Sequence, residues 1–384
     1  MTSNNTALVL SGGGARAAYQ VGILKAIAEI LPQTTHKNPF PIVTGTSAGA
    51  INATVVAAYA QHFKLGMRRL ENVWANFHCH QVFHTSFKEL NKNTWRWIKL
   101  IFGNHPHQAI GLLDNEPLKH LLNSVIPYPL INKALQQGAL KALCVTASSY
   151  SCGESISFYQ SKPDILPWQR HHRHGQASII TTQHLLASAA IPMVFPSVQL
   201  GNKYFGDGSM RFLSPLSPAV QLGADRLLVV GVDPVESTPT TTDPESSSES
   251  ANHGQLSPTL AEIGGHLLDS IFIDSLDSDL ERLQRINDSL AKIPDKIRDK
   301  SFKLRPINTL VINPSEDISQ IARHHFDILP RYLKFFLRRI GIDGDSGDTV
   351  LSYLLFEKPF TKQLINLGYR DALRMREQII DFHL

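Results

Sequence analysis

The stretch ALVLSGGGARAAYQVG, Ala7–Gly22, places an apolar run, three consecutive glycines and a helical pattern in direct succession. A glycine-rich turn between a strand and a helix directs several backbone N–H groups, and the positive end of the helix dipole, toward one point. The stretch therefore predicts an α/β protein with an anion site. That site would hold either the phosphates of a cofactor or an oxyanion that forms during a reaction.

Short apolar runs bounded by turn residues alternate with helical patterns along the rest of the chain, as is typical of α/β proteins. Apolar residues recur at helical spacing in Ala17–Ile30 and Ala48–Ala60, which predicts two helices. The expected strands are Ala7–Leu10, Phe40–Thr44, Ala142–Ser148, Ile156–Tyr159, Arg226–Val232 and Thr309–Ile312. The residues after Ile312 have a helical pattern and are expected to pack on the sheet.

The chain has 384 residues, of which 42% are hydrophobic, and this suits one large domain or two modest ones. Its net charge of +4 gives no support to a nucleic-acid partner. Three cysteines cannot form a disulfide framework, which indicates a reducing compartment. The sequence has no signal-peptide pattern and no apolar run of about 20 residues. We therefore expect a cytoplasmic protein whose membrane contact is at most peripheral; its oligomeric state is not indicated.

A serine lies at the next expected junction between a strand and a helix. Residues 40–53 read FPIVTGTSAGAINA, in which Gly45–Gly49 matches G-x-S-x-G with Ser47 at its centre. The motif needs this context, because the sharp turn exposes the serine Oγ at a helix N-terminus and only glycine fits beside the neighbouring backbone. A small-residue junction without chemistry is the alternative. Ser47 is the candidate nucleophile.

The glycine-rich turn itself allows two interpretations. Gly12-x-Gly14-x-x-Ala17 satisfies the dinucleotide fingerprint, which also requires a carboxylate near the end of the next strand to bind a ribose hydroxyl. The expected strand Phe40–Thr44 continues into Gly-Thr-Ser and carries no acid. An oxyanion hole built from backbone amides is therefore favoured, with Arg16 either adding a charge or pinning the loop.

A nucleophilic serine needs a base. The histidine clusters at 78–80 and 171–174 lack a second ligand pair at zinc-like spacing, so solvated loop histidines are the simpler interpretation and no metal is expected. Asp207 is a better candidate for the base, since it stands between Gly206 and Gly208 after a strand-like aromatic segment. Taken alone, an aspartate beside glycine is usually a turn residue.

Three sequence elements, in this order, resemble the patatin-like phospholipases. They are the glycine-rich Gly12–Arg16, the Gly45–Gly49 motif around Ser47, and Asp207-Gly208 preceded by ASAAIPMVFP. Further similar passages are GLLDNEPLKHLL from Gly111, SPLSPAVQLGADRLLVVGV from Ser214 and YLLFEKPFTKQLINLGYRDAL from Tyr353. The resemblance spans most of the chain, and the order of the three elements is highly specific.

The resemblance implies a three-layer α/β/α sandwich with a mainly parallel central sheet and C-terminal helices. It implies a serine lipid acyl hydrolase of the phospholipase A or lysophospholipase type, which needs no cofactor or metal and acts on phospholipid or lysophospholipid. The implied site consists of the nucleophile Ser47, the general base Asp207, the oxyanion-hole amides of Gly12, Gly13 and Gly14, and the supporting residues Arg16, Gly45, Gly49 and Gly208. A non-catalytic lipid-binding or regulatory protein of the same fold is the alternative.

Two positions depart from the family pattern. Ala17 follows the arginine where the family often has glycine, and Ser209 follows Asp-Gly where glycine or alanine is frequent. Ala17 falls inside the expected helix and should be tolerated. The hydroxyl of Ser209 could compete for Asp207 and alter its basicity. Neither change removes a reacting group.

The expected organisation is a catalytic domain at 1–315 and a helical extension at 316–384 packed on it. Within the first part, 61–111 is a candidate lid, in which Trp95–Phe102 would offer an apolar surface to an acyl chain or a bilayer; an ordinary core helix is the simpler alternative. Residues 236–257 are polar and dotted with proline, which predicts an exposed flexible loop.

The segment LPRYLKFFLRRIG, residues 329–341, predicts an amphipathic helix. One face would carry Leu329, Tyr332, Leu333, Phe336 and Ile340, and another Arg331, Lys334 and Arg338. Such a basic helix can lie on an anionic membrane, but helices of this kind also cover α/β sheets. The second interpretation is the simpler one.

Overall fold

The computed structural model describes residues 5–32, 34–84, 111–211, 214–234, 274–294, 304–339, 342 and 347–382. In these residues the strands are β1 (Thr6–Leu10), β2 (Ile42–Thr46), β3 (Ala142–Ser149), β4 (Ser155–Ser161), β5 (Trp168–Arg170), β6 (Arg173–Ala177), β7 (Val198–Leu200), β8 (Lys203–Gly206), β9 (Arg226–Val230) and β10 (Asn308–Ile312). The α-helices are α1 (Ala18–Ile30), α2 (Ala48–Ala58), α3 (Phe63–Trp74), α5 (Glu116–Val125), α6 (Pro129–Gln136), α7 (Thr182–Ser188), α8 (Ser217–Gln221), α10 (Asp274–Ala291), α11 (Ile318–Arg323), α12 (Arg331–Arg339), α13 (Asp348–Leu354), α14 (Lys358–Arg374) and α15 (Arg376–Asp381).

The strand β1 is buried on both of its faces. Leu8 and Leu10 pack into one core cluster and Ala7 and Val9 into another, on opposite sides of the sheet. β1 pairs in parallel with β9 and β2, and β10 and β3 extend the parallel block to the order β10-β9-β1-β2-β3. The turns that follow these parallel strands therefore meet at one edge of the sheet.

Beyond β3 the sheet is mostly antiparallel. β4 pairs antiparallel with β3, β6 parallel with β4, and the short β5 and β7 antiparallel with β6 and β8. The six strands expected from the sequence agree with β1, β2, β3, β4, β9 and β10 within two residues at each end. β5, β6 and β7 were missed, because they are short, are only partly buried and lack a continuous apolar pattern.

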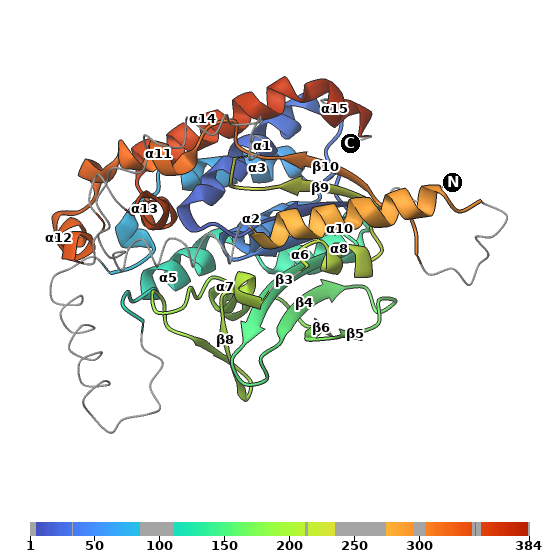
Figure 1. The fold of residues 1–384 in the computed structure, drawn as a ribbon, viewed down its shortest axis with the longest axis horizontal. Coiled ribbons are helices and arrows are strands. Elements are labelled where there is room, and N and C mark those ends of the chain that lie inside the picture. The colour runs from blue at the N-terminus through green and yellow to red at the C-terminus, as the bar shows by residue number, and fades with distance from the viewer. Residues whose placement is uncertain are drawn as a thin grey trace, which may run out of the picture.

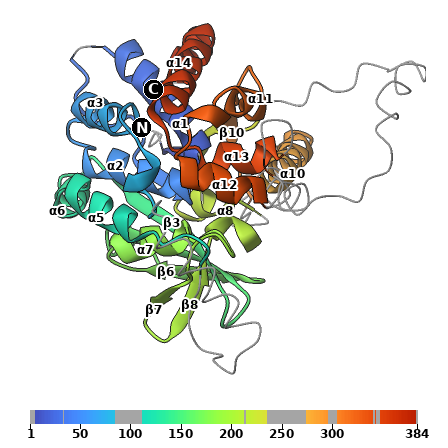
Figure 2. The same cartoon turned by 90° about the vertical axis from the view of Figure 1, so that its left-hand side faces the viewer.

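Helices cover both faces of the sheet, which confirms the predicted three-layer α/β/α sandwich (Figures 1 and 2). α1, α2 and α3 share a core cluster with Leu8 and Leu10, while α8 and α10 share the other cluster with Ala7 and Val9. The predicted C-terminal helices are present as α11 to α15.

Two glycines allow α14 to pack directly on α1. A Cβ at Gly22 would collide with the carbonyl oxygen of Ile365, and a Cβ at Gly368 would collide with that of Tyr19. The Tyr19 hydroxyl also donates a hydrogen bond to Asp371 of α14 (3.1 Å). Because α1 lies between the sheet and α14, nearly all of its residues are buried. The C-terminal helices thus share a core with the N-terminal strand.

The structure describes the candidate lid only in part, at residues 61–84 and 111. There α3 packs on α1 and α2. Trp95–Phe102 and the expected loop 236–257 lie outside the described residues, and both remain predictions. Within the described ranges, no helix combines the length and apolar character that crossing a membrane requires.

The close approach of α1 and α14 gives a first prediction. Gly368→Ala improves the helix propensity of α14 by about 1 kcal/mol, but its Cβ has no space against the Tyr19 carbonyl. We expect the clash to dominate and the free energy of unfolding to fall by roughly 1–3 kcal/mol, measured by urea denaturation. Leu373→Ala, on an exposed position of the same helix, serves as control. A stabilised Gly368→Ala variant would contradict the packing described.

Candidate active site

Ser47 sits on a strained turn between β2 and α2. Its φ of 54° and ψ of −129° are rare for a residue with a side chain and cost about 1–3 kcal/mol. The flanking glycines are required by contact: a Cβ at Gly45 would collide with the carbonyl of Gly49, and a Cβ at Gly49 with the carbonyls of Leu10 and Ser11. The turn is therefore pressed onto the end of β1, as the G-x-S-x-G motif predicts.

The backbone amide of Ser47 is held by a residue that the sequence did not single out. It donates to the Oγ of Ser188 (2.9 Å), and the Ser188 hydroxyl donates in turn to the carbonyl of Thr146 (2.6 Å). Both partners are buried. Ser188 belongs to the quoted ASAAIP stretch at the end of α7, which was the only sequence signal for it. The Ser47 turn is thus tied to the end of β3.

The pairing of β3 with β8 brings Asp207 to the end of β3, where the Ser47 turn also lies. Ser148 of β3 lies opposite Gly206, so Asp207 directly follows a residue in register with β3. Its own amide donates to the carbonyl of Ala190 (2.8 Å), two residues after Ser188. A Cβ at Gly208 would collide with the Thr146 carbonyl, which explains the glycine after the aspartate.

The carboxyl of Asp207 is fully buried. Burial raises its pKa from 3.8 to about 6, because the charged form loses its hydration; the hydroxyl of Ser47, and then the amide and hydroxyl of Ser209, act in the opposite direction. The Ser209 amide donates to Oδ1 (2.9 Å), while Oδ2 makes no hydrogen bond of normal geometry with any described residue. Ser209 therefore influences the basicity of Asp207, and one carboxyl oxygen next to Ser47 is left available.

The glycine-rich turn lies against the same pocket as Ser47. Gly14 has a φ of 53° and lines the pocket, and a Cβ there would collide with the carbonyl of Tyr353. Within the described residues, the amides of Gly12, Gly13 and Gly14 donate no hydrogen bond. Unpaired amides at a turn after a parallel strand are what an oxyanion hole requires.

Arg16 does not line the pocket, and its side chain contacts the C-terminal helices. Its buried guanidinium donates to the hydroxyls of Ser352 (2.6 Å) and Ser319 (2.9 Å), forms an ion pair with Asp233, and stacks over the ring of Tyr353 (4.3 Å). Of the two roles considered for Arg16, these contacts support pinning the loop. The positive charge of Arg16 is paired with the carboxylate of Asp233 and is therefore not available to stabilise an oxyanion.

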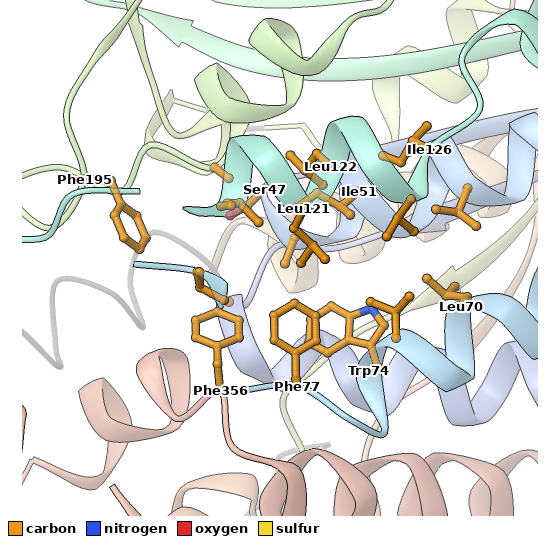
Figure 3. A pocket seen from close by; sticks show the side chains of 18 of the residues that line it. Ser47, Ile51, Leu70, Trp74, Phe77, Leu121, Leu122, Ile126, Phe195 and Phe356 are labelled. Atoms are coloured by element: carbon orange, nitrogen blue, oxygen red, sulfur yellow. The ribbon is translucent and has the colours of Figure 1, made fainter. Parts of the chain in front are cut away.

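Beside Ser47 opens an apolar pocket (Figure 3). It encloses about 710 Å³ of empty space, its open mouth included, and nearly all of its lining is apolar. Figure 3 shows Ser47 between Phe195 on one side and Ile126 on the other, with Trp74 and Phe77 on one wall of the pocket and Leu122 on the opposite wall. The pocket is lined by Gly14, Ser47, Ala48, Ile51, Val55, Leu70, Val73, Trp74, Phe77, Val82, Leu118, Leu121, Leu122, Val125, Ile126, Ala189, Ile191, Phe195, Tyr353 and Phe356.

The histidine clusters lie outside this pocket. His78 contacts Glu357 through Nδ1 (2.9 Å) and stacks on His80, and His174 contacts Glu154 (3.0 Å). Across the described ranges, no group of three or more histidine, cysteine or carboxylate side chains could hold a metal ion.

The buried carboxyl gives a second prediction. The folded protein binds the Asp207 proton more tightly than the unfolded chain, so its free energy of unfolding falls as the pH rises from about 4 to about 6 and stays reduced above that. Asp207→Asn removes the titration. We expect the stability of this variant relative to the parent to increase by about 3 kcal/mol between pH 4 and pH 8, measured by urea denaturation. The control is Asp164→Asn, at an exposed carboxyl. A relative stability of Asp207→Asn that does not change with pH would contradict the effect of burial.

Comparisons with known proteins agree with the sequence elements at this site. A family model described as patatin-like phospholipase matches residues 8–220. Patatin-like phospholipase domain-containing protein 7 of Rattus norvegicus is 40% identical over 75 residues, which is 20% of this chain and 5% of the rat protein. This match therefore spans only a small part of that relative.

Two solved structures are similar at low identity. VipD from Legionella pneumophila is 14% identical with a TM-score of 0.36, over 98% of this chain and 67% of that one. Human GIVD cytosolic phospholipase A2 in complex with methyl gamma-linolenyl fluorophosphonate is 11% identical with a TM-score of 0.41, over 98% and 58%. The family model carries the assignment, because it matches more than half of the chain: the protein belongs to the patatin-like phospholipase family.

Proposed function

We propose that the protein is a serine lipid acyl hydrolase of the phospholipase A or lysophospholipase type. The observation that carries this proposal is the juxtaposition of Ser47, on its strained turn, with a buried Asp207 whose Oδ2 makes no hydrogen bond of normal geometry with a described residue. The apolar pocket beside Ser47 supplies the environment that a fatty acyl chain needs.

In the proposed acylation step the Ser47 Oγ attacks the ester carbonyl carbon, and its proton passes to Asp207. The carbonyl oxygen becomes an oxyanion, which the amides of Gly12, Gly13 and Gly14 stabilise. The C–O bond to the leaving alcohol then breaks, the alcohol takes the proton from Asp207, and the acyl group remains on Ser47.

In the proposed deacylation step a water molecule attacks the acyl carbon. Asp207 accepts the water proton and returns it to the Ser47 Oγ as the fatty acid leaves. A raised pKa suits both steps, because a carboxylate near pKa 6 is a better base than one at 3.8 and is still ionised at neutral pH.

Hydrolysis by matched variants tests the proposal. We expect Ser47→Ala and Asp207→Asn each to lower fatty acid release from phospholipid and lysophospholipid vesicles at least about a thousandfold, because each removes a group that reacts or moves a proton. His171→Ala, which changes a histidine outside the pocket, is the control and should retain activity. Urea denaturation of each variant verifies that the protein is folded.

The same assay distinguishes a hydrolase from a non-catalytic protein of the same fold. A non-catalytic lipid-binding or regulatory protein would bind the vesicles but release no fatty acid, and the substitutions would leave the outcome unchanged. Release that persists in folded Asp207→Asn would reject Asp207 as the base.

We also propose that α12 contacts the membrane. It exposes Tyr332 and Phe335, each by more than half, and Arg331 and Arg339 are also exposed. Leu333 and Leu337 are buried. The sequence placed Tyr332 on the same apolar face as Leu333, whereas in the structure Tyr332 is exposed. α12 lies beside α13 (Figure 2). Phe356, two residues after the end of α13, lines the pocket. Aromatic rings flanked by arginines suit an anionic lipid surface.

Vesicle sedimentation tests this contact. We expect the double variant Arg331→Glu, Arg339→Glu to bind anionic vesicles at least about tenfold more weakly, since each basic residue contributes about 1 kcal/mol near such a surface. The control is Lys162→Glu, at an exposed position in the segment that joins β4 to β5. Equal binding of the double variant and the parent would reject α12 as the contact.

A further inference from the structure

The apolar pocket has a direction that α2 defines. Ser47, Ile51 and Val55 all line it, and their spacing of four residues places them on one face of the helix. In Figure 3, Phe195 lies on one side of Ser47, and Leu70 and Ile126 lie toward the opposite end of the pocket. The part of the pocket between Ser47 and Ile126 is therefore a slot that runs from the nucleophile along two turns of α2.

The helix also gives the depth of the slot. Eight residues separate Ser47 from Val55, which corresponds to about 12 Å along a helix axis. An extended chain of single bonds advances about 1.2 Å per bond, as the backbone of a strand does. An acyl chain attached to the Ser47 Oγ would therefore reach Val55 after about ten carbons.

Buried side chains line the far end of the slot. Val55 and Leu70 are 2% exposed and Ile126 is 3% exposed. They come from α2, from α3 and from the end of α5, so three different segments meet there. A chain longer than the slot would have to displace at least one of them.

A second, more polar cavity lies close to this end. It is lined by residues next to or one turn beyond the same three segments, among them Ala58, Arg69 and Pro127. Arg69 donates a hydrogen bond to the hydroxyl of Tyr59 (2.6 Å), which also lines the second cavity. The two cavities have no lining residue in common. This polar boundary is unfavourable for further methylenes.

We propose that this slot selects acyl chains of about ten carbons, with Ile51 along its length and Val55, Leu70 and Ile126 at its end as the specificity-determining residues. The inference rests on the proposed function, because the acyl group must be attached at Ser47. Each methylene buried in the slot should raise kcat/KM about fourfold until the chain reaches its end, after which kcat/KM no longer rises.

Chain-length profiles of the parent and two variants test the slot. With nitrophenyl esters from C4 to C16 at constant detergent, we expect the parent kcat/KM to be highest near C10. Ile51→Phe places a ring about 6 Å from Ser47, one helical turn away. It should lower the ratio of kcat/KM for the C10 ester to that for the C4 ester at least about a hundredfold. Leu70→Ala removes three carbons from the end wall and should move the maximum to longer chains by about two carbons.

Leu65→Phe is the matched control, since it lies on α3 and lines the second cavity but not the slot. It should leave the profile unchanged. A parent kcat/KM that keeps rising to C16, or an Ile51→Phe variant that lowers the C4 and C10 esters equally, would overturn the proposal.

Binding separates the failure of this inference from the failure of the proposed function. If the parent hydrolyses no ester, the proposed function fails, and calorimetry of Ser47→Ala with fatty acids from C4 to C16 still measures the slot. The affinity should increase about fourfold per methylene and level off near C10. Affinity that is independent of chain length, or that rises to C16, would overturn the inference by itself.

Discussion

The register of β3 against its two neighbours sets the position of Ser47 relative to Asp207. Thr146 lies opposite Thr46 in the parallel pair with β2, and Ser148 lies opposite Gly206 in the antiparallel pair with β8. The Thr146 carbonyl accepts the hydroxyl that holds the Ser47 amide, and Gly208 packs against the same carbonyl. A shift of either pairing by one residue would separate the two side chains.

The burial of Asp207 connects stability with the proposed chemistry. The same loss of hydration that raises its pKa to about 6 makes the ionised carboxyl unfavourable in the folded state. A carboxyl group whose pKa stayed near 3.8 would destabilise the folded state less, but it would be a poorer base. The shared core of β1, α1 and α14 keeps the fold stable while the site carries this cost and the strain at Ser47.

Patterns that are local in the chain could be predicted from the sequence. The apolar run before Gly12, the strand–glycine–helix junction at Ser47 and the parallel core strands all show in short windows of residues. Asp207 has a weak local signal and was reached through the resemblance to a family. Its relation to Ser47 depends on the pairing of β3 with β8, which spans almost sixty residues of chain.

Features that depend on long-range packing could not be predicted. Nothing near Ser188 indicates that its hydroxyl holds the amide of Ser47, and nothing near Arg16 indicates that it bonds to residues more than 300 positions away. The pocket is likewise built from segments distant in the chain, from α2 to Phe356. The sequence predicted that the C-terminal helices pack on the catalytic domain, but it did not indicate that Arg16 and the contact of Gly14 with Tyr353 join them to the glycine loop.

In the proposed mechanism the Asp207 carboxylate accepts the proton of Ser47. The most direct measurement is the rate at which a short alkyl fluorophosphonate labels Ser47 as a function of pH. We expect the rate in the parent to rise through a midpoint near pH 6 and then to level, and we expect Asp207→Asn to be labelled far more slowly at all pH values. Labelling of folded Asp207→Asn at the parental rate, or with the same midpoint, would contradict it.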